Sequence, residues 1–133
     1  MENDVEILIV STRIDNRRTL LHTLEGLPVN IFSASTVRQA LEFLSSHPQA
    51  VVFCEERLPD GSYRELLAEA RTARRLNRFI VVRSAREWEE CLEALKLGAA
   101  EVLRCPLRAP DIEIALFRAM REAREILALH AEA

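Results

Sequence analysis

Five short strand-like runs, several of them continuously apolar, recur along this chain, and each is followed by a segment with the period of a helix. The runs occupy residues 6–10, 29–33, 50–54, 79–82 and 100–103. Apolar residues without alternation are typical of strands that are buried on both faces of a parallel sheet. Strand–helix alternation repeated five times with short connections predicts an α/β fold, a doubly wound parallel sheet of the (βα)5 type.

The segments between these runs carry the apolar period of helices, and their ends carry start and stop signals. Ser35 is expected to cap the second helix. Gly98 follows the fourth helical segment as a stop signal, and Pro110 suits the first turn of the last helix. Two pairs fit the capping box, in which side chains satisfy the free amides of a helix start: Ser62 with Glu65, and Ser84 with Glu87.

The chain of 133 residues has the length of one domain, and no linker or low-complexity segment divides it. Its 49% hydrophobic and 29% charged residues are ordinary for a folded globular protein. The net charge of −3 gives no basic field that would favour nucleic acid or an anionic membrane. We therefore predict a single domain over residues 1–133 that binds neither nucleic acid nor membrane.

Cysteine usage and the N-terminus predict a cytoplasmic protein. The three cysteines, Cys54, Cys91 and Cys105, are far apart and lack the spacing of metal ligands, so we expect reduced thiols. The first ten residues lack the basic segment and the apolar core of a signal peptide. No apolar run approaches the roughly 18 residues that a membrane span needs.

The last helix, expected from about residue 110 to about residue 130, is longer than the sheet needs. Its inward positions recur at alternating steps of four and three, which is the seam of a coiled coil. These positions are Ile112, Leu116, Ala119, Ala123, Ile126 and His130. One interpretation is a core face followed by a frayed tail. The other is that the outer turns contact a partner or a second copy of the chain, which would make a homodimer through this helix.

The sequence lacks the common signatures of catalysis and of metal binding. Its only glycines, Gly26, Gly61 and Gly98, form no phosphate-binding loop, and no His/Cys/Asp cluster has zinc spacing. We predict that the chain is not an enzyme and holds no resident cofactor or metal.

Two acidic residues, Glu55 and Glu56, lie where the third strand opens into the turn LPDG at residues 58–61. In open α/β sheets, ligands bind at the carboxyl ends of the strands. Glu56 is expected to face solvent at the rim of such a pocket. The role of Glu55 depends on the residues that share the pocket.

The chain resembles the receiver domain of bacterial two-component response regulators over about residues 5–125. The motifs that carry this resemblance are ILIV in the first strand, EERLPDGS after the third, VVRSA at the fourth, EALKLGAAEVL from the fourth helix to the fifth strand, and the dipeptide CP. The resemblance implies a flavodoxin-like (βα)5 fold with strand order 2-1-3-4-5. It also implies an acidic pocket in which an aspartate accepts a phosphoryl group with the help of Mg²⁺.

The resemblance places the phosphoacceptor at Glu55 and the acidic pair that holds Mg²⁺ at Ser11 and Thr12. Mg²⁺ is usually held by carboxylates, so two neutral hydroxyls leave its site weak or lost. Without the metal, the charge on a transferring phosphoryl group is largely unneutralised. Glu55 is also one methylene longer than aspartate, a misplacement of about an ångström that can cost on the order of 10²-fold in rate.

The remaining pocket positions depart from the family pattern as well. The switch hydroxyl falls on Arg83, or on Ser84 after a shift of one residue, and the phosphoryl-binding lysine is Cys105, which offers no fixed positive charge. Leu107 occupies the position after the next proline, where the family commonly has an aromatic residue. Arg83 could supply a positive charge to the pocket or pair with Glu55. The bond between Cys105 and its proline is a candidate cis bond, as the equivalent bond commonly is in this family.

Several interpretations stay open at this point. Glu55 is either a solvated or arginine-paired carboxylate at a vestigial site, or its extra reach imitates a phosphorylated aspartate. For Ser84, a helix cap competes with a switch hydroxyl. For Cys105, an inert thiol competes with one that is open to oxidation.

We predict a pseudo-receiver, a signal-transduction module that acts by protein–protein interaction without aspartyl phosphorylation. Its partner would be a histidine kinase, an effector domain or another signalling protein. The resemblance places the contact face on the fourth helix, fifth strand and fifth helix. The candidate interface residues there are Trp88, Glu101, Leu107 and Ile112. Two alternatives remain, a phosphorylatable response regulator with an atypical pocket and a small-molecule or redox sensing domain.

Overall fold

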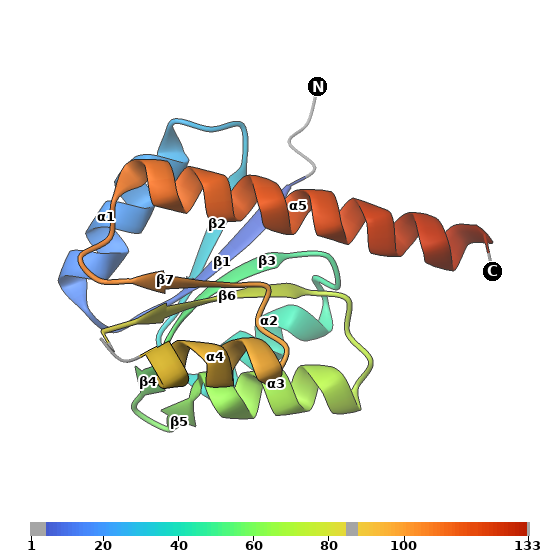
Figure 1. The fold of residues 1–133 in the computed structure, drawn as a ribbon, viewed down its shortest axis with the longest axis horizontal. Coiled ribbons are helices and arrows are strands. Elements are labelled where there is room, and N and C mark those ends of the chain that lie inside the picture. Colours follow the sequence, from blue (N-terminus) through green and yellow to red (C-terminus); the bar gives the residue numbers. More distant parts are fainter. Residues whose placement is uncertain (1–4, 85–87, 133) are drawn as a thin grey trace.

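The computed structural model describes residues 5–84 and 88–132, which form a parallel sheet between two layers of helices (Figure 1). The strands of the sheet are β1 (Glu6–Val10), β2 (Asn30–Ala34), β3 (Val51–Glu55), β6 (Arg78–Arg83) and β7 (Glu101–Arg104). The helices are α1 (Ile14–Glu25), α2 (Val37–Ser45), α3 (Tyr63–Thr72), α4 (Trp88–Lys96) and α5 (Ala109–Glu132). A short antiparallel hairpin of β4 (Arg57–Leu58) and β5 (Gly61–Ser62) follows β3.

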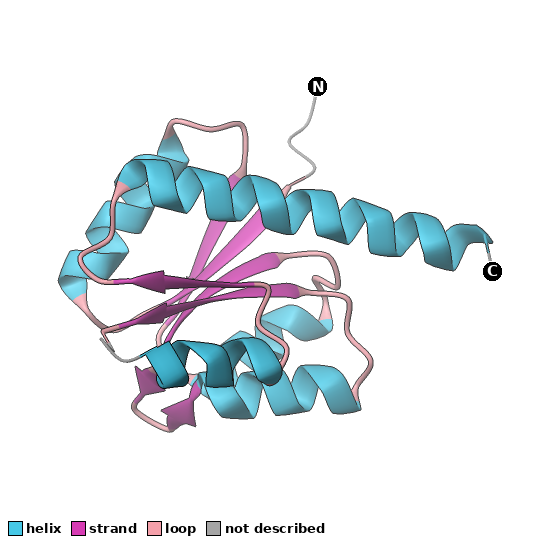
Figure 2. Cartoon of the chain, viewed as in Figure 1, coloured by secondary structure: helices cyan, strands magenta, loops and turns pink. Residues whose placement is uncertain are grey.

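The strands of the sheet pair in the order β2-β1-β3-β6-β7, all in parallel (Figure 2). Because β6 and β7 are the fourth and fifth strands of this sheet, the order confirms the predicted 2-1-3-4-5. From β1 the chain goes to β2 on one side of β1, and it then continues to β3 on the other side of β1. In doubly wound sheets, ligands bind at the carboxyl edge beside such a reversal.

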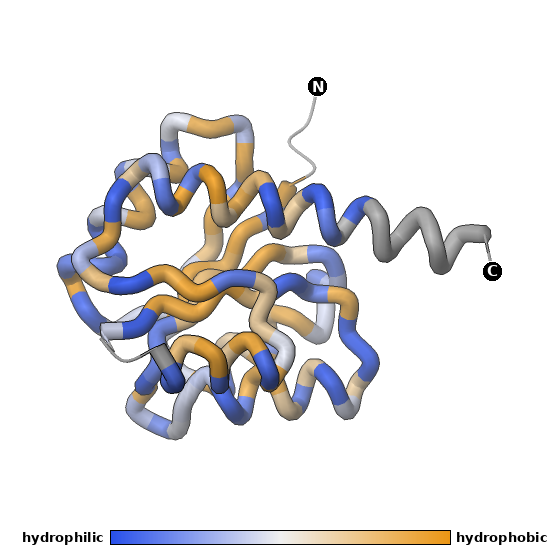
Figure 3. Tube along the Cα trace, in the orientation of Figure 1, coloured by the Kyte–Doolittle hydropathy of each residue, from blue (hydrophilic) through white to orange (hydrophobic). Residues whose placement is uncertain are grey.

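The sheet separates two hydrophobic cores, because successive residues of a strand point to opposite faces. Val52 and Val81 pack on one face with residues of α2, α3 and α4. Phe53 and Val82 pack on the other face with residues of α1 and α5. Figure 1 shows the same division, and Figure 3 shows the apolar central strands between the two layers. The parity of a residue along its strand therefore decides which helices it meets.

The central strands β1, β3 and β6 are buried along almost their whole length, as the continuously apolar runs predict. The edge strands β2 and β7 are more exposed and have a mixed sequence. The predicted bounds are right for β1 and differ by one residue at each end of the other four strands. The β4–β5 hairpin was not predicted, because two-residue strands carry no periodic signal.

The helix starts are partly as predicted. Thr36, and not Ser35, caps α2, because the Thr36 hydroxyl accepts a hydrogen bond from the Gln39 amide at 3.0 Å. The backbone amide of Ser35 donates to the side chain of Gln39 instead. The capping box of Ser62 and Glu65 at the start of α3 is confirmed. The Glu87 half of the box predicted for α4 lies outside the described residues.

Helix α4 ends at a glycine stop signal, whereas helix α5 continues beyond the sheet. The stop signal at Gly98 is confirmed, since α4 ends at Lys96 and Gly98 has a φ of 111°, a conformation that favours glycine. Helix α5 projects past the sheet, and its first buried positions, Ile112, Leu116 and Ala119, belong to the core as predicted. The side chains of Ala123, Ile126 and His130 lie outside the described residues, so a contact through the outer turns stays a prediction. Within the described residues, every helix is too short or too polar to span a membrane.

Candidate functional site at the carboxyl ends of the strands

The candidate site lies where β1, β3, β6 and β7 end, beside the reversal of strand order between β1 and β3. The sheet register aligns Glu55 with Val82, and Arg83 with Arg104. A cavity of about 370 Å³ opens at this edge. Its walls are formed by Arg13, Asn16, Glu55, Glu56, Arg57, Val82, Ser84 and Cys105.

The carboxylate of Glu55 points toward the loop between β1 and α1, and the residue is only 4% exposed. Its Oε2 atom accepts hydrogen bonds from the Ser11 hydroxyl at 2.5 Å and from the Asn16 side-chain amide at 3.2 Å. Its Oε1 atom accepts from the backbone amides of Thr12 at 2.9 Å and Arg13 at 3.3 Å. Both oxygens of this carboxylate are therefore held by neutral donors.

The start of α1 explains why a carboxylate is stable in this nearly buried position. The first amides of a helix lack partners within the helix, and the helix dipole is positive at this end. The N-cap residue of α1, Arg13, makes no capping bond with its own side chain, and Glu55 supplies an acceptor from β3. The expectation that Glu55 is solvated or paired with an arginine is therefore wrong.

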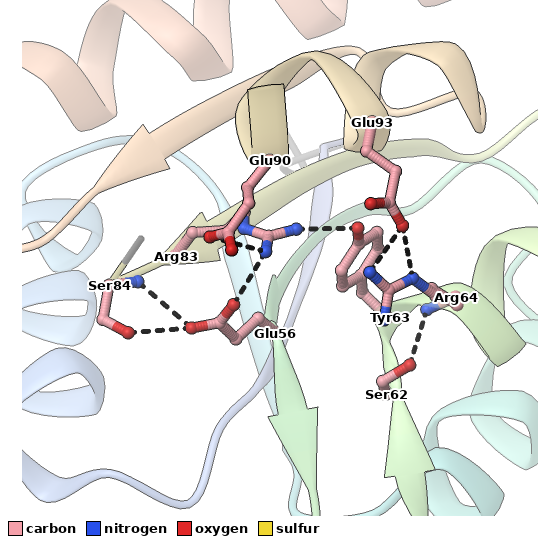
Figure 4. Close-up of polar contacts among 8 residues, drawn as sticks. All are labelled: Glu56, Ser62, Tyr63, Arg64, Arg83, Ser84, Glu90 and Glu93. Atoms are coloured by element: carbon pink, nitrogen blue, oxygen red, sulfur yellow. Dashed lines mark hydrogen bonds and ion pairs between the residues drawn. The ribbon is translucent and has the colours of Figure 1, made fainter. Parts of the chain in front are cut away.

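Glu56, the next residue, joins a different group of side chains (Figure 4). Its Oε1 atom accepts hydrogen bonds from the Ser84 hydroxyl at 2.8 Å and from the Ser84 backbone amide at 3.3 Å. Its Oε2 atom lies 3.1 Å from a guanidinium nitrogen of Arg83. The Glu56 side chain is 23% exposed and lines the cavity, so it lies at the rim as expected, but Ser84 and Arg83 bind its carboxylate.

Arg83 is a buried cation that connects three elements of the fold, and its side chain is 5% exposed. Beside its ion pair with Glu56, the guanidinium donates to the Tyr63 hydroxyl at 2.7 Å. It also lies 3.6 Å from the carboxylate of Glu90 in the first turn of α4 (Figure 4). The expectation that Arg83 pairs with Glu55 is wrong, because Arg83 binds Glu56 and Glu90 instead.

Strand parity explains why the two adjacent glutamates have different partners. Glu55 has the parity of Phe53, which faces α1 and α5. Arg83 has the parity of Val81, which faces the opposite layer of α2, α3 and α4. Glu56 follows Glu55 and turns to that opposite layer, where it meets Arg83.

Cys105 forms another wall of the cavity. The peptide bond between Cys105 and Pro106 is cis, as predicted. The thiol donates a hydrogen bond to the side-chain oxygen of Asn16 at 3.4 Å. Burial raises the pKa of Cys105 above its ordinary value of 9.0, and the Asn16 hydrogen bond opposes this effect only in part. A thiol with a raised pKa stays neutral, which favours the inert interpretation of Cys105 over the oxidisable one.

The turn of the β4–β5 hairpin has a structural role. The carboxylate of Asp60 accepts hydrogen bonds from the backbone amides of Val37 at 2.7 Å and Arg38 at 3.1 Å, at the start of α2. The bond from Val37, with a smaller contribution from Arg38, holds the pKa of Asp60 below its ordinary value of 3.8. A Cβ atom on Gly61 would lie 3.1 Å from the carboxyl carbon of Glu65, so the turn favours glycine.

Comparison with known proteins identifies the fold. No protein-family model matches the chain. The transcriptional regulatory protein ZraR of Escherichia coli K12 is 26% identical over 124 residues, which cover 93% of this chain and 28% of ZraR. A signal receiver domain from Vibrio parahaemolyticus superposes with a TM-score of 0.87 at 17% identity, over 94% of this chain and 96% of that domain. A response regulator receiver domain from Clostridium thermocellum gives 0.81 at 22% identity, over 92% and 98%.

The chain has the receiver fold. The predicted resemblance to response regulator receiver domains is confirmed by these comparisons. The chain spans little more than a quarter of the length of ZraR, so the activity of that whole protein is a separate matter.

The receiver fold brings the predicted pocket positions to one edge of the sheet, in two separate groups. Ser11 and Thr12 contact Glu55, whereas Arg83 and Ser84 contact Glu56. Sequence reasoning missed the parts played by Asn16, Glu56, Tyr63 and Glu90. A signal for Glu56 was present, because a period of two along β3 and β6 sets it apart from Glu55.

The predicted interface residues on α4, β7 and α5 have different surroundings. Glu101 lines an open groove of about 840 Å³ and pairs with Arg118 at 3.2 Å. Leu107 is partly buried against the core of α1 and α5. Ile112 is fully buried in that core, so it is not available to a partner and its predicted interface role is wrong. The side chain of Trp88 lies outside the described residues.

Two other apolar residues are exposed in the same groove. Leu95 of α4 is 42% exposed and Ile114 of α5 is 49% exposed. Neither of them was predicted from the sequence. Ile114 lies between two of the inward positions of α5 and therefore points away from the core.

Proposed function

We propose that this chain is a receiver domain of a bacterial two-component response regulator that signals by protein–protein contact without aspartyl phosphorylation. The observation that carries the proposal is the saturation of Glu55, whose two carboxylate oxygens both accept hydrogen bonds from the β1–α1 loop and α1. The likeness to receiver domains supports the signalling role.

A nucleophilic carboxylate needs a free oxygen that faces the incoming phosphorus atom. To attack, Glu55 would have to leave the Ser11 hydroxyl and the amides of Thr12 and Arg13, and the buried Ser11 hydroxyl and the partly buried amides would lose this acceptor. An unsatisfied buried donor costs about 1–3 kcal/mol, which would add directly to the barrier for transfer. The contacts of Glu55 therefore oppose phosphoryl transfer even before the metal is considered.

The groups around Glu55 also fit Mg²⁺ poorly. Mg²⁺ takes oxygen ligands in octahedral geometry, and carboxylates usually hold it. Here Ser11 and Thr12 offer hydroxyls and an amide that donate to Glu55, and the carboxylates of Glu55 and Glu56 both already have partners within the site. The described residues contain no group of three or more His, Cys, Asp or Glu side chains that could hold a metal. We infer that Mg²⁺ binding is weak or lost.

Neither Cys105 nor Arg83, the two positions expected to supply positive charge, offers a free cation to a phosphoryl group. Cys105 stands at the lysine position, and its neutral thiol is a weak donor. Arg83 is committed to Glu56, Glu90 and Tyr63. The raised pKa of Cys105 also gives no support to a redox function for this site.

The contact face that we propose is the groove of α4, β7 and α5. Leu95 and Ile114 supply exposed apolar surface, and the ion pair of Glu101 with Arg118 supplies polar groups. Apolar centres with polar rims are common in protein interfaces. The proposed partner is a histidine kinase, an effector domain or another signalling protein, and a second copy of the chain through α5 is one form of it.

The proposal is tested by treating the chain with a small phosphodonor and Mg²⁺ and measuring its intact mass. We expect no mass increase in the natural chain. The matched control restores the pocket of the family with the changes Ser11→Asp, Thr12→Asp, Glu55→Asp and Cys105→Lys, and we expect it to gain one phosphoryl group. A phosphoryl group on the natural chain that disappears in Glu55→Gln would overturn the proposal in favour of an atypical phosphorylatable receiver.

A further inference from the structure

The end of β3 is tied to the start of the β6–α4 connection by a single side chain. Glu56 accepts two hydrogen bonds from Ser84, one from its hydroxyl at 2.8 Å and one from its backbone amide at 3.3 Å. Ser84 is the first residue after β6, and the chain continues from it toward α4. Ser84 is exposed and Glu56 is partly buried, so Glu56 is the fixed partner and Ser84 is the residue that it holds.

Arg83 extends this tie into α3 and α4. Its guanidinium pairs with Glu56 at 3.1 Å, donates to the hydroxyl of Tyr63 at 2.7 Å and lies 3.6 Å from Glu90 (Figure 4). Tyr63 is the first residue of α3, and Glu90 lies in the first turn of α4. The guanidinium therefore joins an anion from the end of β3 to the starts of two helices.

We propose that Glu56 is a built-in anion that fixes Ser84 and the first turn of α4 in one position. The contact face on α4 is then set by the chain itself and needs no added phosphoryl group. This inference rests on the proposed function, because it names the residue that fixes the signalling state. The sequence left open that Glu55 imitates a phosphorylated aspartate, and the contacts assign that part to Glu56.

Glu55 cannot perform this role in the observed arrangement. Its described hydrogen bonds go to Ser11, Thr12, Arg13 and Asn16, at the opposite side of the pocket from Ser84. Its parity along β3 directs it toward α1. A change at Glu55 should therefore leave α4 in place.

A second ion pair provides a matched control. Arg64 of α3 pairs with Glu93 of α4 at 2.5 Å, and both side chains are about half exposed. An exposed pair of this kind constrains its helices weakly. The change Glu93→Gln removes a carboxylate from the same helix α4 without touching Ser84 or Arg83.

The experiment compares backbone amide NMR spectra and amide hydrogen exchange of Glu56→Gln, Glu55→Gln and Glu93→Gln with those of the natural chain. In Glu56→Gln we expect the Ser84 amide to exchange about tenfold faster, because the neutral amide oxygen of glutamine is a weaker acceptor than the carboxylate and no longer pairs with Arg83. We also expect shifts that spread along α4 to its last turn. In Glu55→Gln the shifts should stay in the β1–α1 loop and α1, and in Glu93→Gln they should stay next to residue 93.

The inference is overturned if α4 keeps its natural spectrum in Glu56→Gln, or if Glu55→Gln or Glu93→Gln moves α4 as far. The variant Ser84→Ala keeps the ion pair with Arg83 and removes only the hydroxyl bond, so it serves if Glu56→Gln does not fold. It should move α4 in the same direction by a smaller amount, and an unchanged α4 would again overturn the inference. Phosphorylation of the natural chain would instead defeat the proposed function, whatever α4 does.

Discussion

The two halves of the pocket hold adjacent glutamates by different means. On the β1–α1 side, Glu55 is surrounded by a hydroxyl, a side-chain amide and two backbone amides, all neutral. On the β6–α4 side, Glu56 shares a buried cation with Glu90 and accepts two bonds from Ser84. One step along a strand thus separates a carboxylate stabilised by oriented dipoles from one stabilised by an ion pair.

This difference determines what each carboxylate can transmit. The donors to Glu55 belong to one loop and the start of one helix, so a change there has local consequences. Arg83 has partners on β3, α3 and α4, so a change at Glu56 alters the charge balance of a group that spans three elements. The half of the pocket around Glu55 therefore has only local contacts, whereas the half around Glu56 and Arg83 connects three elements of the fold.

The largest effect on stability is expected from Glu55→Leu. This change removes the acceptor of the Thr12 and Arg13 amides and the closer acceptor of the buried Ser11 hydroxyl, which keeps only the Arg13 carbonyl at 3.3 Å. We expect the free energy of unfolding to fall by about 3 kcal/mol, measured by urea denaturation. The exposed residue Glu69 provides the control, and Glu69→Leu should change stability by less than about 0.5 kcal/mol. A loss below about 1 kcal/mol in Glu55→Leu would mean that the donors find other partners and that Glu55 does not stabilise the β1–α1 half of the pocket.

A smaller effect, with a definite asymmetry, is expected on the other half. Glu56→Gln leaves the buried guanidinium of Arg83 with the neutral Tyr63 hydroxyl and with Glu90 at 3.6 Å as its described carboxylate partner, and we expect a loss of about 2 kcal/mol. Arg83→Met removes the cation and leaves two carboxylates that can reach water, so we expect a loss of only about 1 kcal/mol. The same denaturation series measures both. A larger loss for Arg83→Met would show that packing, and not charge, holds this junction.

The pH dependence of stability should show the contribution of a third carboxylate, that of Asp60, which is exposed in the β4–β5 turn after β3. Its folded-state pKa is lowered, chiefly by the amide of Val37, so its contribution is present above 3.8 and is lost as pH falls through the folded pKa. We expect the natural chain to lose more stability than Asp60→Asn between about pH 5 and about pH 2. Parallel curves for the two proteins would show that Asp60 does not stabilise α2.

The smallest effect is expected for thiol chemistry in the cavity. Burial raises the pKa of Cys105, so its thiol should react with iodoacetamide at pH 8 more slowly than a free cysteine. The rate is followed by peptide mass analysis, with the unfolded chain as reference. Faster reaction than in the unfolded chain would support the redox alternative and would mean that the cavity contains a reactive thiol.

Much of the fold could be predicted from local patterns. The continuously apolar runs identify β1, β3 and β6, and the capping box identifies the start of α3. The patterns fail where one residue decides the outcome, as for Thr36 over Ser35 at α2. The apolar stripe placed Ile112 in the core correctly, whereas its assignment to the contact face followed from the resemblance and is wrong.

The pocket could be located from the sequence, but its internal pairing could not. The strand ends placed Glu55 at the carboxyl edge, and the resemblance to receiver domains added Ser11 and Arg83. Which glutamate meets Arg83 depends on the register of β3 against β6, a relation between segments that are distant in the chain. No local pattern encodes that register. However, adjacent residues of a strand point to opposite faces, so the sequence could have predicted that only one of the two glutamates contacts Arg83.

The most direct test of the account is an NMR titration of the natural chain with Mg²⁺ and then with Mg²⁺ plus beryllofluoride, a mimic of the acyl-phosphate group. The account predicts that the amides of Thr12, Arg13 and Ser84 keep their positions at millimolar concentrations, because Glu55 is saturated and Glu56 already holds Ser84. Shifts at Thr12 and Arg13 that spread through Ser84 into α4 would contradict it. They would show that Glu55 is a working acceptor linked to a switch.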